Sequence, residues 1–217
     1  SFVMKEDIDR DRLQKAVTQA LQRFPTFRVH LRRGFFWYYL EENNLPFRVL
    51  QDDGHPCMPM RFGENNGFLF RVLVYEKRIS LEVFHALADG TGGLAFLKAI
   101  VAQYLRLGGI PVPFENGIMD CSEPPKPEET EDAYRLIPTD SVHASRQEAR
   151  AYPMGGTLEL QHTLNLISAE IPVDVLREKA RSYGVTITEY LVSVMVFTLW
   201  QTQQKGHSAK HMPVKVS

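Results

Sequence analysis

Cysteine is scarce in this sequence: Cys57 and Cys121 are the only two in 217 residues. They have none of the spacings of a metal site, and so little cysteine is typical of a reducing compartment. The first residues, SFVMKEDIDRD, also lack the basic, apolar and small segments of a signal peptide. We therefore expect a cytoplasmic protein, with a single disulfide bond as the alternative state of the two thiols.

Long apolar runs and an excess of one charge are missing as well. The most apolar window, residues 190–200, falls short of the ~20 residues that span a bilayer, so no membrane span is predicted. The formal net charge of −1 gives no electrostatic reason to expect a nucleic-acid partner or an anionic membrane. The basic cluster RVHLRRG at 28–34 alternates with apolar residues, and we interpret it as solvated strand surface rather than a phosphate track.

Metal-binding residue types are present but scattered. Six of the 7 histidines lack the complete ligand spacing of a metal site, so no metal centre is predicted. These are His30, His55, His143, His162, His207 and His211. The remaining one, His85, stands in a different pattern.

The first half of the chain alternates between helical and strand periods, and its apolar content of 44% allows a substantial core. Asp9 is a good N-cap for a helix whose apolar stripe runs from Leu13 to Phe24 and ends at Pro25. Further elements are predicted from the same patterns. They are paired strands at 27–33 and 35–42, a hairpin of 68–75 with 79–85, and a helix over 91–107. This helix has an apolar stripe and ends at Gly108-Gly109. The stripe comprises Leu94, Leu97, Val101, Tyr104 and Leu105.

The composition changes after Pro113. Residues 121–132, CSEPPKPEETED, are acidic and proline-rich, which is typical of a linker or mobile loop. Order then resumes in a further set of elements, the last helix opening on a Thr186–Glu189 capping box. They are one or two strands within 157–171, helices over 173–183 and 186–203, and the start of a strand at 211–217. We therefore divide the chain into a first lobe, a linker and a second lobe, at 1–118, 119–155 and 156–217.

These elements together predict the α/β class, as an α+β sandwich. Within it, the stretch FHALADGTGG at 84–93 places a histidine where a strand turns into a helix. Side chains in a strand alternate between its two faces. This alternation puts His85 on the apolar face of its strand, in phase with Ile79, Leu81 and Val83. Junctions of this kind are common positions for reactive side chains, so His85 is the candidate catalytic residue.

The residues FHALADG resemble the His-His-x-x-x-Asp-Gly signature of the coenzyme A-dependent acyltransferase superfamily, with Phe84 in place of the first histidine. That superfamily includes chloramphenicol acetyltransferase, alcohol acetyltransferases and the condensation domains of peptide synthetases. The segments 21–41 and 171–197 resemble the corresponding regions of these enzymes, the second especially that of bacterial alcohol acetyltransferases. The resemblance covers most of the chain except the acidic linker, and it implies a chloramphenicol acetyltransferase-like lobe with a mixed sheet and flanking helices.

The resemblance implies specific roles for several residues. His85 would be the general base that takes a proton from an alcohol acceptor, or from an amine, as it attacks the thioester of acyl-coenzyme A. Asp89 would pair with an arginine to hold the turn, with Arg28 the first candidate and Arg23 the second. An N-cap or a simple turn former is the alternative for Asp89. Gly90, Gly92 and Gly93 would let the backbone turn and pack closely, with an anion site for a coenzyme phosphate as the alternative.

Acyl-coenzyme A is then a co-substrate, and no covalently bound cofactor is predicted. The aromatic run Trp37, Tyr38 and Tyr39 is interpreted as core and strand surface, with an acyl or acceptor pocket as the alternative. Apart from that run, no substrate-binding residue is assigned.

Members of the superfamily place the histidine in a tunnel between two lobes, and they carry a later Asp-Phe-Gly-Trp-like motif that this chain lacks. The chain also stops at PVKVS, so the resemblance implies an incomplete second lobe. We expect little turnover from this chain alone, and either the missing lobe or a second copy as its partner. Two other functions stay open: a condensation-type domain that uses carrier-protein thioesters, and a non-catalytic member that binds an acyl ligand or a protein.

Overall fold

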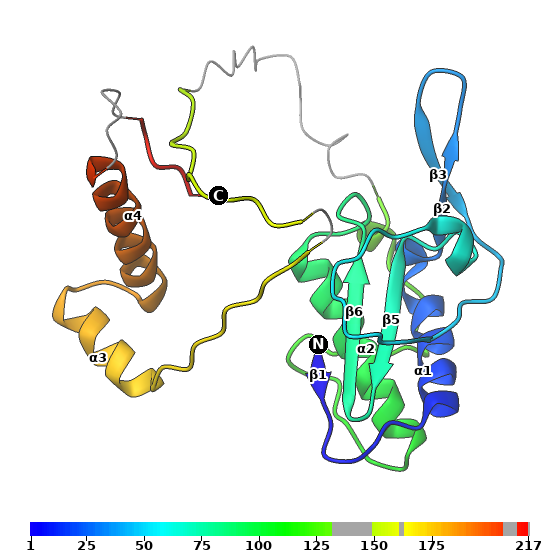
Figure 1. The fold of residues 1–217 in the computed structure, drawn as a ribbon. Coiled ribbons are helices and arrows are strands. Elements are labelled where there is room, and N and C mark those ends of the chain that lie inside the picture. Colours follow the sequence, from blue (N-terminus) through cyan, green and yellow to red (C-terminus); the bar gives the residue numbers. More distant parts are fainter. Residues whose placement is uncertain (132–148, 161–162, 206–211, 217) are drawn as a thin grey trace. The chain divides into compact units, whose positions relative to one another are not determined.

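The computed structural model describes residues 1–131, 149–160, 163–205 and 212–216. The chain forms two compact units, residues 1–137 and 138–217. Figure 1 traces both units along the sequence.

The first helix of the first unit, α1 (Arg10–Arg23), begins where the sequence predicts. The carboxylate of Asp9 accepts a hydrogen bond from the Arg12 amide at 2.9 Å, which satisfies one of the free N–H groups of the first turn. The predicted apolar stripe is buried, and Pro25 starts a short 3₁₀ turn, Pro25–Phe27, in place of a further helical turn. The buried stripe comprises Leu13, Ala16, Val17, Ala20 and Leu21.

The central sheet has four strands in the order β1-β6-β5-β4. Its centre is the predicted antiparallel hairpin, in which Tyr75 pairs with Arg78 across a two-residue turn at Glu76 and Lys77. One edge strand is antiparallel and the other is parallel, so the sheet is mixed as expected. The four strands are β1 (Phe2–Val3), β4 (Leu50–Gln51), β5 (Phe70–Tyr75) and β6 (Arg78–Val83).

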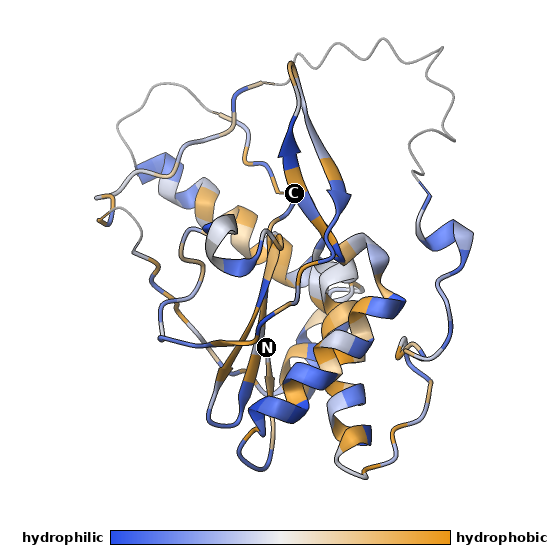
Figure 2. Cartoon of the chain, turned by 90° about the vertical axis from the view of Figure 1, so that its right-hand side faces the viewer, coloured by the Kyte–Doolittle hydropathy of each residue, from blue (hydrophilic) through white to orange (hydrophobic). Residues whose placement is uncertain are grey.

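The second helix, α2 (Gly90–Leu107), packs beside α1 on one face of this sheet, as Figure 1 shows. The predicted stripe is correct at Leu97, Val101 and Tyr104, but Leu94 is 48% exposed. The buried face is instead rotated toward Phe96 and Ile100, which lie between α1 and the sheet. Figure 2 shows that the strands of the central sheet and parts of the two helices are coloured orange, for hydrophobic residues.

Aromatic rings join these elements into one core. Phe96 of α2 stacks on Phe27 with ring centroids 4.2 Å apart, and it meets the edge of Phe70 of β5 at 5.2 Å. Phe70 in turn stacks on Phe47 at 4.6 Å. Buried ring pairs of this kind add about 0.5–1.5 kcal/mol each beyond their buried area. The core therefore fixes the start of α2 against the middle of the sheet.

A separate hairpin of β2 (Val29–Arg33) and β3 (Tyr38–Glu42) extends away from the central sheet (Figure 1). The predicted pairing is confirmed, with Leu31 opposite Leu40. A single bridge between His30 and Phe68 connects the base of this hairpin to the start of β5. Every residue of β3 is exposed, so the aromatic run at 37–39 is strand surface rather than core.

The start of the expected linker 119–155 belongs to the first unit and packs within it. Cys121 is buried, and a 3₁₀ turn at Pro127–Glu129 places the Glu129 carboxylate on the Arg23 guanidinium with contacts of 2.5 and 2.8 Å. Residues 132–148 of the linker lie outside the described residues.

The second unit contains two of the predicted helices, α3 (Val173–Ser182) and α4 (Ile187–Lys205). The capping box is formed, because Thr186 and Glu189 exchange hydrogen bonds of 2.7 and 3.2 Å. Gly184, with φ of 70°, turns the chain between the helices. Among the described residues no single helix has both the length and the apolarity to cross a bilayer, although α3 and α4, bent by 79°, meet that threshold as a pair.

The strands predicted in the second unit are not formed over the described residues. Residues 157–160 and 163–171 carry no strand, and neither do 212–216, while 211 and 217 lie outside the described part. Their alternating pattern suits a half-buried strand, but a strand also needs a hydrogen-bonded neighbour. Without one, Leu158 and Ile167 stay exposed.

Candidate functional site

His85 lies in a turn between β6 and α2. The strand ends at Val83, two residues earlier than predicted, so His85 does not lie on the strand itself. The Phe84 amide donates to the Leu69 carbonyl at 2.8 Å. The Leu87 amide then donates to the Phe84 carbonyl at 2.8 Å, which closes a turn around His85. These two contacts fix the backbone on either side of the imidazole.

Asp89 closes the other end of this turn as the N-cap of α2. Its carboxylate accepts from the Gly92 amide at 2.8 Å, and its carbonyl accepts from the Gly93 amide at 2.9 Å. A Cβ on Gly92 would lie 3.3 Å from the Ala88 side chain, whereas one on Gly90 would meet nothing within 4 Å. Close packing therefore favours glycine at Gly92, whereas the space around Gly90 does not.

The ion pair between Asp89 and Arg28 that the resemblance implies is not formed. The Arg28 guanidinium donates to the Asn43 carbonyl at 3.3 Å and to the Asn44 side chain at 2.5 Å, and it lies 3.7 Å from the Glu42 carboxylate. The bend after α1 directs Arg28 toward the end of β3, while the Gly92 amide of α2 donates to the Asp89 carboxylate. The alternative role for Asp89, an N-cap, is the one that the structure has.

The second candidate, Arg23, is paired elsewhere. Its side chain is 7% exposed and bonded to both carboxylate oxygens of Glu129, whose own side chain is 32% exposed. The Arg23 hydrogen bond, together with a second one from the Lys126 amide at 3.0 Å, lowers the pKa of the Glu129 carboxyl to about 2. Sequence reasoning missed this pair because Glu129 lies in the acidic stretch predicted to be a mobile loop.

An open hollow of about 380 Å³ lies beside His85. It is walled by the helix-facing side of β6 and by the first two turns of α2, and Asp89 is the only charged side chain around it among the described residues. The His85 side chain is exposed and makes no hydrogen bond or ion pair with the described residues. A reactant therefore has an open route to the imidazole. The walls are Ser1, Leu81, Val83, Ala88, Gly90, Gly93, Leu94 and Leu97.

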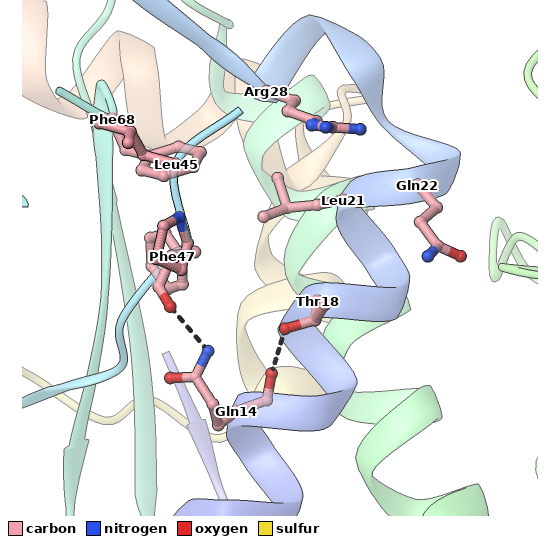
Figure 3. Close-up of a pocket in the computed structure, with 9 residues that line it drawn as sticks. Gln14, Thr18, Leu21, Gln22, Arg28, Leu45, Phe47 and Phe68 are labelled. Carbon is pink, nitrogen blue, oxygen red and sulfur yellow. Dashed lines mark hydrogen bonds between the residues drawn. The ribbon is translucent and has the colours of Figure 1, made fainter. Parts of the chain in front are cut away.

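A second hollow of about 270 Å³ lies between α1 and the segment 45–47, as Figure 3 shows. Leu21, Phe47 and Phe68 supply its apolar wall, and Arg28 lies at its rim. Gln14 spans it by donating to the Phe47 carbonyl at 2.8 Å. No sequence motif predicts this hollow, because its lining residues come from three segments that are far apart in the sequence: 14–28, 45–47 and residue 68.

The other candidates form no site with His85. Trp37, Tyr38 and Tyr39 do not line its hollow. His30 contacts the Glu41 carboxylate at 2.8 Å, and no cluster of potential metal ligands occurs in the described part of the chain. Burial raises the pKa of the Cys121 thiol, which disfavours the nucleophilic thiolate. The remaining histidines, other than His55, fall outside the described residues: His143, His162, His207 and His211.

Comparison with known proteins adds a structural likeness. No family model matches the chain, and no curated protein matches it by sequence. Polyketide synthase associated protein 5 from Mycobacterium tuberculosis is similar over 95% of this chain, with a TM-score of 0.54 and 16% sequence identity. The SgcC5 protein from Streptomyces globisporus is similar over 50% of this chain and 29% of its own, with a TM-score of 0.37 and 17% identity.

The likeness to polyketide synthase associated protein 5 shows the fold. It is the chloramphenicol acetyltransferase-like fold, a mixed sheet with flanking helices, as the sequence predicts. The chain spans about half, 54%, of the length of that protein.

Proposed function

We propose that this chain carries the acceptor-activating half of an O-acyltransferase, which moves an acyl group from acyl-coenzyme A to an alcohol. The observation that carries the proposal is the position of His85, solvent-accessible at an open hollow in the turn between β6 and α2. The chloramphenicol acetyltransferase-like fold supports the same reaction class. Acyl-coenzyme A is a co-substrate in this proposal.

In the proposed reaction His85 acts as a general base. The neutral imidazole takes the hydroxyl proton as the alcohol oxygen bonds to the thioester carbonyl carbon. The tetrahedral intermediate then collapses with cleavage of the C–S bond, and the imidazolium returns the proton to the leaving thiolate. The products are an ester and the free thiol, and His85 ends in its original protonation state.

The hollow beside His85 is open on one side, and a reaction of this kind requires exclusion of water from the thioester. We therefore propose that further protein covers the imidazole during turnover. A second lobe or a second copy of this chain would supply that cover. The length of the structural neighbour, about twice the aligned region, supports the first choice.

The test is thiol release from short acyl-coenzyme A donors, with a panel of alcohols, by the full-length protein. His85→Ala is expected to lower kcat/KM by about 10²–10⁴-fold, the range of positioned base catalysis. His55→Ala is the matched control, because His55 is also an exposed histidine of the first unit, 3.8 Å from Asp53. Full activity in His85→Ala would eliminate the base assignment.

One observation favours a second candidate, a non-catalytic acyl-ligand binder. No described residue orients the His85 imidazole by a hydrogen bond, and positioned bases in enzymes usually have such a partner. Tight binding of acyl-coenzyme A without thiol release would favour this function. Release only from an acylated carrier protein would favour a condensation-type domain instead.

A further inference from the structure

The end of the β2–β3 hairpin carries three consecutive aromatic side chains in solvent. Phe35, Phe36 and Trp37 are 94%, 86% and 65% exposed. Their rings contact one another, with centroids 5.5 Å apart for Phe35 and Phe36 and 6.5 Å for Phe36 and Trp37. The end of the hairpin is therefore an apolar cluster that the described residues of the first unit leave exposed. Figures 1 and 2 show this hairpin extending from the first unit.

A band of arginine and tyrosine follows directly behind this cluster. Arg33 is paired with Tyr38, and Arg32 is paired with Tyr39 in the next row of the ladder. Residues 31–40 contain these two cations and no acidic residue. The acidic side chains, Glu41 and Glu42, stand at the base of the hairpin. The outer half of the hairpin is thus positively charged although the whole chain is nearly neutral.

The two arginines differ in their contacts. Arg32 donates to the Glu41 carboxylate at 2.8 Å, which His30 also contacts, and these bonds lower the pKa of the Glu41 carboxyl. The Arg33 side chain makes no hydrogen bond or ion pair within the described parts of the chain. At least one guanidinium beside the aromatic cluster is therefore available to an external anion.

We propose that the tip of the β2–β3 hairpin docks on an anionic lipid bilayer. The three rings would enter the interface, and Arg33 with Tyr38 and Tyr39 would lie at the level of the headgroups. Tryptophan and tyrosine favour that depth, and each basic residue near an anionic surface contributes about 1 kcal/mol of binding. The four-residue loop 34–37 extends roughly 7 Å beyond the last ladder pair at about 3.4 Å per residue. That reach fits the ~5–10 Å depth of interfacial side chains.

The shape of the hairpin favours a bilayer over a protein partner. The rings lie at the convex end of a two-stranded ribbon, and the strand that follows them is exposed along its whole length. A protein would need a pocket complementary to all three rings, whereas a fluid interface accepts them without a matching shape. Docking of this kind is independent of acyl transfer, because the tip does not line the hollow around His85.

The test follows Trp37 fluorescence in the full chain on a Trp200→Phe background, which leaves Trp37 as the only tryptophan. The probes are vesicles of phosphatidylcholine with and without 30% phosphatidylserine, a fraction chosen to give a strongly anionic surface of roughly −30 mV. We expect a blue shift with anionic vesicles, quenching by lipids brominated near the headgroup, and weaker binding at high salt. The double variant Phe35→Ser, Phe36→Ser is expected to weaken binding at least tenfold, and Arg33→Glu about tenfold on anionic vesicles only.

Ile110→Ser is the matched control, since it removes an exposed apolar side chain elsewhere in the first unit and is expected to leave binding unchanged. An unchanged Trp37 spectrum at saturating lipid would overturn the proposal. So would equal binding of the wild-type chain and the double Phe variant. Self-association that the double Phe variant abolishes, without vesicle binding, would assign the tip to a second copy of the chain instead.

Discussion

The pair between Arg23 and Glu129 permits a quantitative prediction. In Glu129→Gln the charge on the 3₁₀ turn is lost, and the Arg23 guanidinium, 7% exposed, keeps only a neutral acceptor. A pKa displaced from 4.5 to about 2 corresponds to about 3 kcal/mol at 1.36 kcal/mol per unit. Because the Glu129 side chain is about a third exposed, solvent screening reduces the expected loss to about 1–2 kcal/mol.

The pH dependence has a definite sign. The folded-state pKa of Glu129 is depressed, so its contribution to the free energy of unfolding is complete above pH 4.5 and is lost as the pH falls toward 2. The assay is urea unfolding of the full chain, followed by circular dichroism at several pH values. The difference in stability between wild type and Glu129→Gln is expected to be constant from pH 7 to 5 and to shrink from there to pH 2.

Glu128→Gln is the matched control for this experiment. Glu128 is the exposed neighbour of Glu129 in the same turn, and it makes no hydrogen bond or ion pair with the described residues. We expect a change in stability within about 0.5 kcal/mol, as is usual for surface positions. Equal losses in the two variants, or a difference that does not depend on pH, would refute the assignment of the stabilisation to the Arg23 pair.

Two further predictions concern the start of α2 and the aromatic core. Asp89→Ala is expected to lower the free energy of unfolding by about 1 kcal/mol, measured by thermal unfolding. Asp89→Asn is expected to change it almost not at all, because asparagine caps a helix equally well. A large loss of stability in Asp89→Asn would instead indicate an ion pair. Phe96→Ala is expected to cost about 3–5 kcal/mol by the same measurement, because its fully buried ring packs against Phe27 and Phe70. A loss below 1 kcal/mol would mean that the surrounding rings close the cavity.

The elements that the sequence predicts correctly are those fixed by local signals. The Asp9 cap, the stripe from Leu13 onward and the Thr186–Glu189 capping box each depend on residues within a few turns of one another. The hairpin of β5 and β6 needs only a turn between two apolar runs. Local patterns therefore suffice to place His85 between a strand and a helix.

The errors arise where the outcome depends on distant residues. The Arg23–Glu129 pair joins positions 106 apart, and no local pattern selects it over a pair with Asp89. The strands predicted within 157–171 have the correct period but no neighbouring strand in the described structure. Leu94 is apolar and in phase with the helix, yet its exposure depends on the direction from which α1 and the sheet approach α2.

The turn that holds His85 is assembled almost entirely from short-range contacts. The Leu87 amide reaches back three residues, and the amides of Gly92 and Gly93 reach Asp89 three and four residues earlier. Closing loops this short costs little chain entropy, so the turn can form early in folding and can be carried intact into a different surrounding sequence. Mutational drift at a remote position such as Arg28 would then leave the geometry of this turn unaltered.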